Sequence, residues 1–211
     1  MLENIRLGRV ESPQHTAGVM EFYTEIKKIF EKPHQDQEKL ESLYQTGIQL
    51  LLLDTPFEDK VTILYNLMYL YTDHPELYYF MGWIHQISNR EKIISIYWYT
   101  TALQKFMEYR ISQNQPHPYE IENWLDLFKN LFEEDYTKKI QDLLNTYQSI
   151  IQDYVTKKEV RIIHFLGAYY IKTNQLKRAQ SMYQIILDPN FPKDQETEFQ
   201  IQNNSLVLYS R

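Results

Sequence analysis

The sequence predicts an all-α protein built of antiparallel helical hairpins. Three observations lead to this fold class. Apolar residues recur at helical spacing through most of the 211 residues. The chain has only five glycines and eight prolines, and most prolines lie between the periodic runs, whereas a β-sandwich or barrel would need more turn residues. One segment, Val160 to Asn190, has the residue order of a hairpin that stacks on copies of itself.

Prolines and polar clusters divide the first half of the chain into five expected helices. Thr55-Pro56 is a start signal, in which a capping residue precedes a first-turn proline. Pro33 should end the first of these helices, because proline cannot continue the hydrogen-bond ladder. The expected helices are Pro13 to Glu31, Asp36 to Leu53, Thr55 to about Tyr71, Asp73 to about Ser88, and Glu91 to about Ile111.

The second half begins after Ser112 to Pro118, a polar loop with two prolines that is the clearest break in the chain. Three helical stretches are expected beyond it: Tyr119 to Phe132, Asp135 to Tyr154 with Asp135 as its cap, and the hairpin Glu159 to Leu187. The tail, Asp194 to Arg211, has a weak pattern that we interpret as a closing helix. The chain therefore divides into a lead-in over 1–35, a region of about four hairpins over 36–192, and a tail over 193–211.

The hairpin in Val160 to Asn190 has a physical explanation for its spacing. Its first helix has one apolar stripe, on which Gly167 adds no side chain, so a second backbone can approach closely there. Ala179 serves the same purpose on the returning helix, and Tyr183 lies one turn later, where it can fill the space beside Ala179. Asn174 lies in the turn and can adopt the left-handed conformation that ends a helix. The stripe consists of Ile163, Leu166 and Tyr170.

This segment resembles a tetratricopeptide repeat (TPR), whose pattern runs W-x2-L-G-x2-Y, then A-x3-F, then a closing Pro. The distance from Gly167 to Ala179 is the twelve residues that the pattern requires. Two positions depart from it: Pro189 comes about two residues early, and Ile186 stands where a small residue is usual. The resemblance implies a right-handed TPR-like superhelix of stacked hairpins and a role in recognising another protein.

Weaker copies of the pattern lie earlier in the chain. Tyr78-x2-Met81-Gly82-x2-His85 has the order of the first helix, and the returning helix keeps the small, aromatic, small spacing one residue late, so its turn should be one residue longer. Gly47 lies 35 residues before Gly82, close to the period of this family, but Asp59 takes the place of its small partner. The pair over Tyr119 to Tyr154 has no glycine and must pack differently. The late small and aromatic residues are Ser95, Tyr99 and Ala102.

Several kinds of chemistry find no support in the sequence. Cysteine is absent, the net charge is −6, and no basic run of the length typical of nucleic-acid binding occurs. No H-E-x-x-H or glycine-rich phosphate loop can be found. We expect His85 and His164 to be packing residues, His34 and His117 to be solvated beside prolines, and Glu133-Glu134-Asp135 to be a solvated turn. The prediction is a protein that is not an enzyme and holds no cofactor or metal.

The sequence also gives an expectation for location. The longest apolar stretch, Ile48 to Leu53, is too short for a membrane span. Met1 to Val10 lacks the apolar core of a signal peptide. We therefore expect a soluble, cytoplasmic protein without a membrane span or a nucleic-acid partner.

Candidate partner-binding residues come from two groups of side chains. The aromatic clusters around Gly82 contain more rings than one buried stripe can use, so some should face another helix or a groove. Two cations near the strong hairpin could receive a carboxylate of a bound peptide. The candidates are Tyr78, Tyr79, Tyr97, Trp98, Tyr99, Arg161 and Lys172.

The expected function is a scaffold or adaptor that binds a peptide or partner helix in a concave groove, lined by the helices that carry Gly47, Gly82 and Gly167. Two alternatives stay open. Asp73 to Gly82 is similar to the central repeat of the TPR-type bacterial secretion chaperones, which implies a chaperone for exported proteins. The chain could instead be an obligate subunit of a larger assembly. An enzyme would require a pocket that gathers His85 or His164 with carboxylates.

Overall fold

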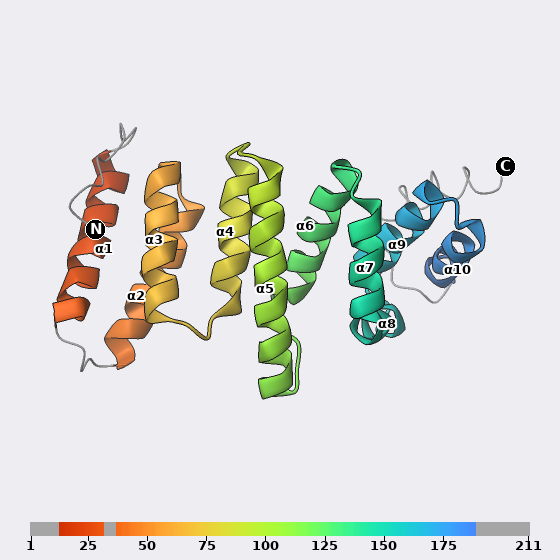
Figure 1. Ribbon diagram of the computed structural model, residues 1–211. Coiled ribbons are helices and arrows are strands. Elements are labelled where there is room, and N and C mark those ends of the chain that lie inside the picture. The colour runs from red at the N-terminus through yellow and green to blue at the C-terminus, as the bar shows by residue number, and fades with distance from the viewer. Residues whose placement is uncertain (1–12, 32–36, 189–211) are drawn as a thin grey trace. The chain divides into compact units, whose positions relative to one another are not determined.

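The computed structural model describes residues 13–31 and 37–188, and all regular structure in these ranges is α-helical (Figure 1). This confirms the all-α fold class. The ten helices of the described residues are α1 Pro13–Glu31, α2 Gln37–Leu52, α3 Phe57–Leu70, α4 Pro75–Ile87, α5 Lys92–Gln113, α6 Glu120–Glu133, α7 Thr137–Thr146, α8 Gln148–Thr156, α9 Val160–Lys172 and α10 Leu176–Ile186.

The internal contacts divide the chain into two compact units, 1–120 and 121–211, which we describe separately. In the first unit each helix packs on the next in sequence from α1 to α5, and α4 and α5 form the closest pair. In the second unit α7 packs on α8, α8 on α9, and α9 most closely on α10. Packing between neighbours in the sequence is the arrangement expected of stacked hairpins.

The two hairpins predicted to be most alike share one contact, between the glycine of the first helix and a tyrosine of the second. A Cβ atom on Gly82 would lie 2.6 Å from Cδ1 of Tyr99, and one on Gly167 would lie 2.6 Å from Cζ of Tyr183. In each hairpin the aromatic ring of the returning helix therefore occupies the space that the glycine leaves open. Ser95 and Ala179, the small residues four positions before these tyrosines, are fully buried.

The turns of these hairpins close in the same way. Asn89 and Asn174 adopt the left-handed conformation, with φ of 49° and 59°. The next amide in each case bonds back to a carbonyl in the last turn of the helix, Arg90 N–H to His85 O and Gln175 N–H to Tyr170 O. This is the Schellman arrangement, which satisfies carbonyls at the end of a helix. The turn after α4 is one residue longer than the turn after α9, as predicted, because α5 begins at Lys92 and α10 at Leu176.

Substitutions at Asn174 test this turn. Asn174→Gly should leave the free energy of unfolding nearly unchanged, because glycine adopts a positive φ without strain. Asn174→Val should lower it by about 1–2 kcal/mol, because a β-branched residue is strained in the left-handed region. Urea titration followed by circular dichroism measures both values. Equal stability of the two variants would show that this turn does not depend on the left-handed residue.

Three local predictions are wrong. The expected helix Asp135 to Tyr154 breaks at Tyr147, whose ring packs edge-on against Trp124 with centroids 5.4 Å apart, so α7 and α8 are separate. Asp135 is not a cap, because it occupies the left-handed turn position after α6 with φ of 59°. Thr55 does not cap α3 either, since its hydroxyl donates to the Leu50 carbonyl of α2 at 2.8 Å.

The remaining predictions on boundaries lie at or beyond the described residues. Pro33, Pro189, the lead-in before residue 13 and the tail over 193–211 are outside the described residues. Ile186, which stands where a small residue is usual, is fully buried with Ile163 and Tyr183 in the core of the α9–α10 hairpin. The core of this hairpin therefore accommodates isoleucine at a position where a smaller residue is usual.

Candidate functional site

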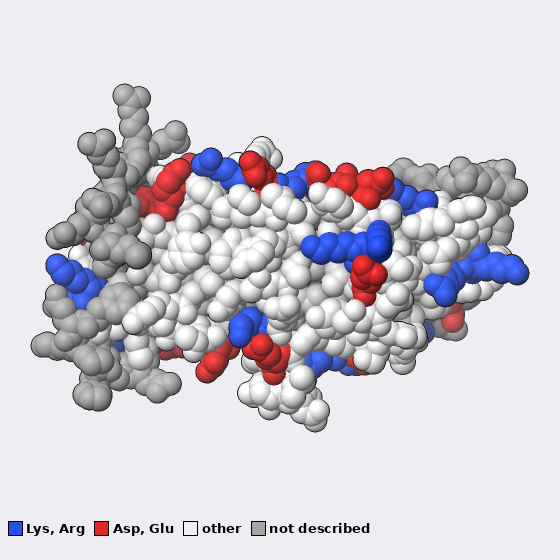
Figure 2. Space-filling view, viewed as in Figure 1, with Lys and Arg blue, Asp and Glu red and all other residues white. Residues whose placement is uncertain are grey.

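Helices α3 and α5 contain long runs without charge. Residues 61–72 and 93–104 include no Asp, Glu, Lys or Arg. Figure 2 shows the result on the surface of the first unit: over α3, α4 and α5 the charged side chains lie at the upper and lower margins of an uncharged face. A surface helix normally carries charged residues on its outer side, so this surface is unusual.

Helices α3 and α5 carry exposed aromatic side chains. Tyr65 and Tyr69, one turn apart on α3, are 53% and 72% exposed, and Tyr97 on α5 is 62% exposed. Trp98 lies between them, with its ring centroid 6.3 Å from Tyr65, 6.5 Å from Tyr78 and 5.3 Å from Tyr97. We call Tyr65, Tyr69, Tyr78, Tyr97 and Trp98 the aromatic face. Charge depletion with aromatic enrichment is the composition found at the centre of protein–protein interfaces.

The structure brings together three of the predicted site residues, Tyr78, Tyr97 and Trp98. Tyr65 and Tyr69 were not among them. The uncharged run over 61–72 with tyrosines at i and i+4 was the available signal. Only the packing of α3 on α4 and of α4 on α5, which brings the ring of Tyr65 near Trp98, shows that the two groups form one surface.

Tyr79 and Tyr99 do not face solvent, and for them the expectation of an exposed ring is wrong. Tyr99 is 0% exposed and its hydroxyl donates to Gln86 Oε1 at 2.7 Å. Tyr79 is buried, and its ring stacks on Tyr119 with centroids 5.8 Å apart. Because Gly82 leaves room for Tyr99, this ring fills the interior of the hairpin and cannot touch a partner.

Arg161 and Lys172 are already paired within the second unit. Arg161 bonds to Glu122 at 2.7 Å and to Glu159 at 3.1 Å. Lys172 donates to the Phe132 carbonyl at 3.0 Å, pairs with Asp135 at 2.9 Å and lies 4.3 Å from the centre of the Phe132 ring. Both cations therefore already have carboxylate partners within the chain, and Lys172 also satisfies a carbonyl at the C-terminal end of α6.

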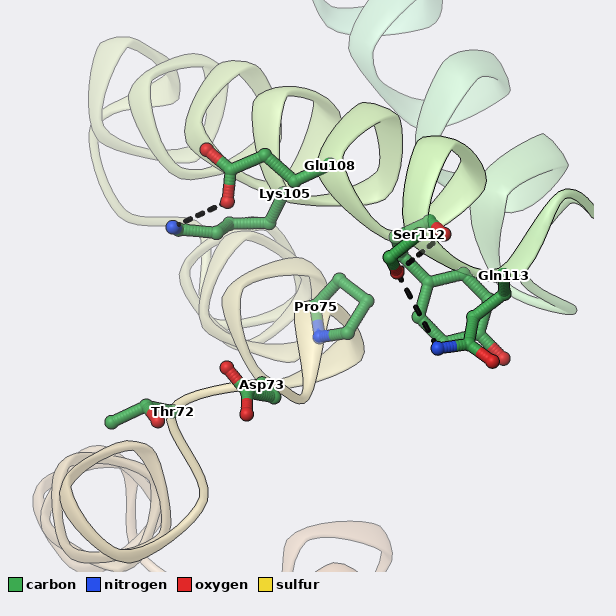
Figure 3. Close-up of a pocket in the computed structure, with 8 residues that line it drawn as sticks. Thr72, Asp73, Pro75, Lys105, Glu108, Ser112 and Gln113 are labelled. Carbon is green, nitrogen blue, oxygen red and sulfur yellow. Dashed lines mark hydrogen bonds and ion pairs between the residues drawn. The ribbon is translucent and has the colours of Figure 1, made fainter.

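A polar pocket continues along the same side of α5. Its volume is about 440 Å³, and it lies between the α3–α4 connection and the last turns of α5 (Figure 3). Lys105, two turns after Trp98, donates to Glu108 Oε2 at 2.7 Å within it. The pocket gives the aromatic face a polar margin. Its lining residues are Thr72, Asp73, Pro75, Lys105, Glu108, Tyr109, Ser112 and Gln113.

A buried carboxylate, Glu76 at the start of α4, is the second notable group in the first unit. Tyr44 of α2 and His74 before α4 donate to its Oε1, the latter at 3.0 Å, and His117 Nε2 lies 3.3 Å from its Oε2. Burial would raise the pKa of the Glu76 carboxyl, but these three partners hold that pKa well below its usual range. The hydrogen bond to Glu76 raises the pKa of His74, against a smaller opposing effect of burial.

His117 corrects a prediction. Its side chain is only 12% exposed and lies against Phe106 and Tyr109, with ring centroids 5.2 and 4.8 Å away, so it is not a solvated loop residue. The neighbouring prolines of the sequence suggested an exposed loop. The contact with Glu76 spans α4 and the α5–α6 connection, and no local pattern in the sequence reports it.

His85 and His164 lie among aromatic rings. Burial lowers the pKa of both. His85 is edge-on to Phe57 with centroids 5.1 Å apart, and His164 is edge-on to Tyr183 at 6.2 Å. Over the described ranges no cluster of three His, Asp or Glu residues could hold a metal ion. Where the structure is described, it has no helix that combines the length and the apolar character needed to cross a membrane.

Comparison with known proteins adds no further constraint. No family model, curated protein or solved structure matches the chain. The functional assignment therefore rests on the side chains and their arrangement.

Proposed function

We propose that the chain is a non-enzymatic scaffold or adaptor of TPR-like helical hairpins, and that its aromatic face binds an amphipathic helix of a partner protein. The observation that carries this proposal is the uncharged, aromatic surface on α3, α4 and α5. Tyrosine and tryptophan supply large contact areas at low entropic cost and dominate the energetics of protein interfaces.

The chemistry of the aromatic face indicates what kind of partner surface it can bind. A charged side chain placed over it would lose water and gain no counter-charge, so the contacting side of the partner should be apolar and uncharged. The described residues present helices only, which offer no strand edge for an extended peptide to join. An amphipathic helix fits best, since its apolar stripe can lie over the aromatic rings and its polar side can reach the margin formed by Lys105, Glu108 and Asp73.

The TPR-like arrangement is supported by the glycine and tyrosine contacts of the α4–α5 and α9–α10 hairpins and by their matching turns. The proposed surface differs from the concave groove expected from the resemblance. Four of its five residues lie on α3 and α5, which do not carry the contact glycines, and only Tyr78 lies on α4. The adaptor is preferred to an obligate subunit because the exposed rings are tyrosines, whose hydroxyl groups remain hydrated when the face is free.

Partner capture followed by binding measurements tests the proposal. The whole chain is used as bait in extract of the native source, and the helical segment of each captured protein is then made as a peptide for calorimetry. Tyr65→Ala and Tyr97→Ala should each weaken its binding about tenfold or more, as expected for interface tyrosines. Tyr136→Ala, an exposed tyrosine of the second unit, is the matched control and should leave the affinity unchanged.

Salt dependence and oligomeric state distinguish a partner helix from other occupants of the aromatic face. Because the face has no charge, the affinity should change little between low and high salt. Unchanged binding in both face variants would refute this surface as the site. Self-association that disappears in Tyr97→Ala, seen by sedimentation equilibrium, would assign the face to a second copy of the chain instead.

A further inference from the structure

The two ring nitrogens of His117 make different contacts, a hydrogen bond at Nδ1 and a close approach to a carboxylate oxygen at Nε2. The Tyr119 N–H donates to Nδ1 at 3.2 Å, while Nε2 lies 3.3 Å from Glu76 Oε2. A ring nitrogen that accepts a hydrogen bond carries no proton, so this network assigns the proton of the neutral ring to Nε2, facing the carboxylate. The backbone carbonyl of His117 also accepts from Glu120 N–H at 3.0 Å.

We propose that His117 is a proton-dependent latch: its neutral ring joins the backbone of Tyr119 to the buried carboxylate of Glu76, and protonation of the ring releases the Tyr119 amide. A proton on Nδ1 turns the acceptor into a donor that faces another donor, so the Tyr119 hydrogen bond cannot persist. The segment affected, 117–120, is the end of the first unit, directly before Ile121 of the second.

The groups around His117 are compatible with this switch. Glu76 remains a carboxylate through the range in which imidazoles titrate, because its pKa lies below the usual range. The ring of His117 packs against Phe106 and Tyr109 of α5 and stacks near Tyr119 at 6.0 Å. The other ionisable groups nearby are Tyr44 of α2, with Glu41 acting on it, His74 with Asp73 beside it, and the half-buried Arg110 with its buried partner Glu120.

His74 gives a pH dependence of opposite sign, so the test needs a local readout. The folded state raises the pKa of His74, and its pair with Glu76 is therefore complete below the ordinary histidine pKa of 6.5 and is lost as pH rises through the raised value. Acidification should strengthen that pair while it releases the Tyr119 amide. Global stability would mix the two effects, whereas exchange at a single amide separates them.

Amide hydrogen exchange of the full chain, measured by NMR, tests the latch. The protection factor, which is already corrected for the intrinsic effect of pH on exchange, should fall about fivefold for the Tyr119 amide between about pH 8 and pH 5.5. A fall of this size corresponds to the loss of one ordinary hydrogen bond. The nitrogen shifts of the His117 ring at the higher pH should show the Nε2–H form. A constant protection factor, or the Nδ1–H form, would overturn the proposal.

Two variants distinguish the roles of the two ring nitrogens of His117. His117→Asn keeps an acceptor for the Tyr119 amide but cannot be protonated, so protection should remain and lose its pH dependence. His117→Gln keeps a donor that can reach Glu76 but lacks the near acceptor, so protection should be low at both pH values. His85→Asn is the control, in which the Tyr119 amide should behave as in the parent. Persistent pH dependence in His117→Asn would contradict the assignment even if His117→Gln fails to fold.

Discussion

Tyr99→Ala should lower the free energy of unfolding of the first unit by about 3–5 kcal/mol, as expected when a fully buried aromatic side chain is removed. Tyr99 is 0% exposed, it fills the space beside Gly82, and its hydroxyl donates to Gln86. The alanine would leave a cavity between α4 and α5 that the rigid hairpin can close only in part. It would also leave Gln86 without this donor.

Tyr97→Ala is the matched control, since Tyr97 lies two residues earlier on α5 and is largely exposed. Its removal should change the unfolding free energy by no more than about 0.5 kcal/mol. Urea denaturation followed by circular dichroism gives both values. Similar losses in the two variants would show that Tyr99 does not fill the interior of the hairpin. Because Tyr99→Ala acts on folding, it is unsuitable as a test of the proposed binding, whereas Tyr97→Ala is suitable.

Gly82→Ala should destabilise the first unit by about 1–2 kcal/mol, although alanine is the better helix former. The added Cβ would lie 2.6 Å from Cδ1 and 3.0 Å from Cγ of Tyr99, near the base of a buried ring that cannot swing aside. Overpacking of this kind costs about 1–3 kcal/mol, and the gain in helix propensity of about 1 kcal/mol offsets only part of that cost.

Gly18→Ala is the control, for which we expect a change in stability of opposite sign. Gly18 lies in α1, and its added Cβ would approach only the tip of the Leu50 side chain, at 3.3 Å. The helix propensity gain should dominate there, so the variant should be as stable as the parent or more stable by up to about 1 kcal/mol. Thermal unfolding of the two variants side by side measures the difference. A stabilising Gly82→Ala would mean that the close approach of α4 and α5 does not depend on glycine.

The sequence alone predicted where the helices lie and how two of the hairpins close. Apolar spacing and helix-ending residues act within a few positions of the chain, so α1 to α6, α9 and α10 fall within about two residues of their predicted bounds. The positions of the glycine and of the small and aromatic residues on the next helix were also predictable, whereas the packing of the tyrosine ring on the glycine was seen only in the structure. These positions depend on residue size at a fixed offset, which a short repeat makes visible.

The aromatic face and the surroundings of the buried carboxylate were decided by tertiary structure. The sequence indicates that the aromatic residues around Tyr97 and Trp98 are too many for one buried stripe, but only the packing of α3 on α4 and of α4 on α5 shows that Tyr65 joins them. It also shows that Tyr79 and Tyr99 turn inward. His117 looked like a solvated loop residue because prolines flank it, and only its contact with Glu76 reveals otherwise. Local periodicity fixes the direction of each helix face, whereas contacts between distant segments depend on how those faces pack, and no single stretch of sequence encodes that packing.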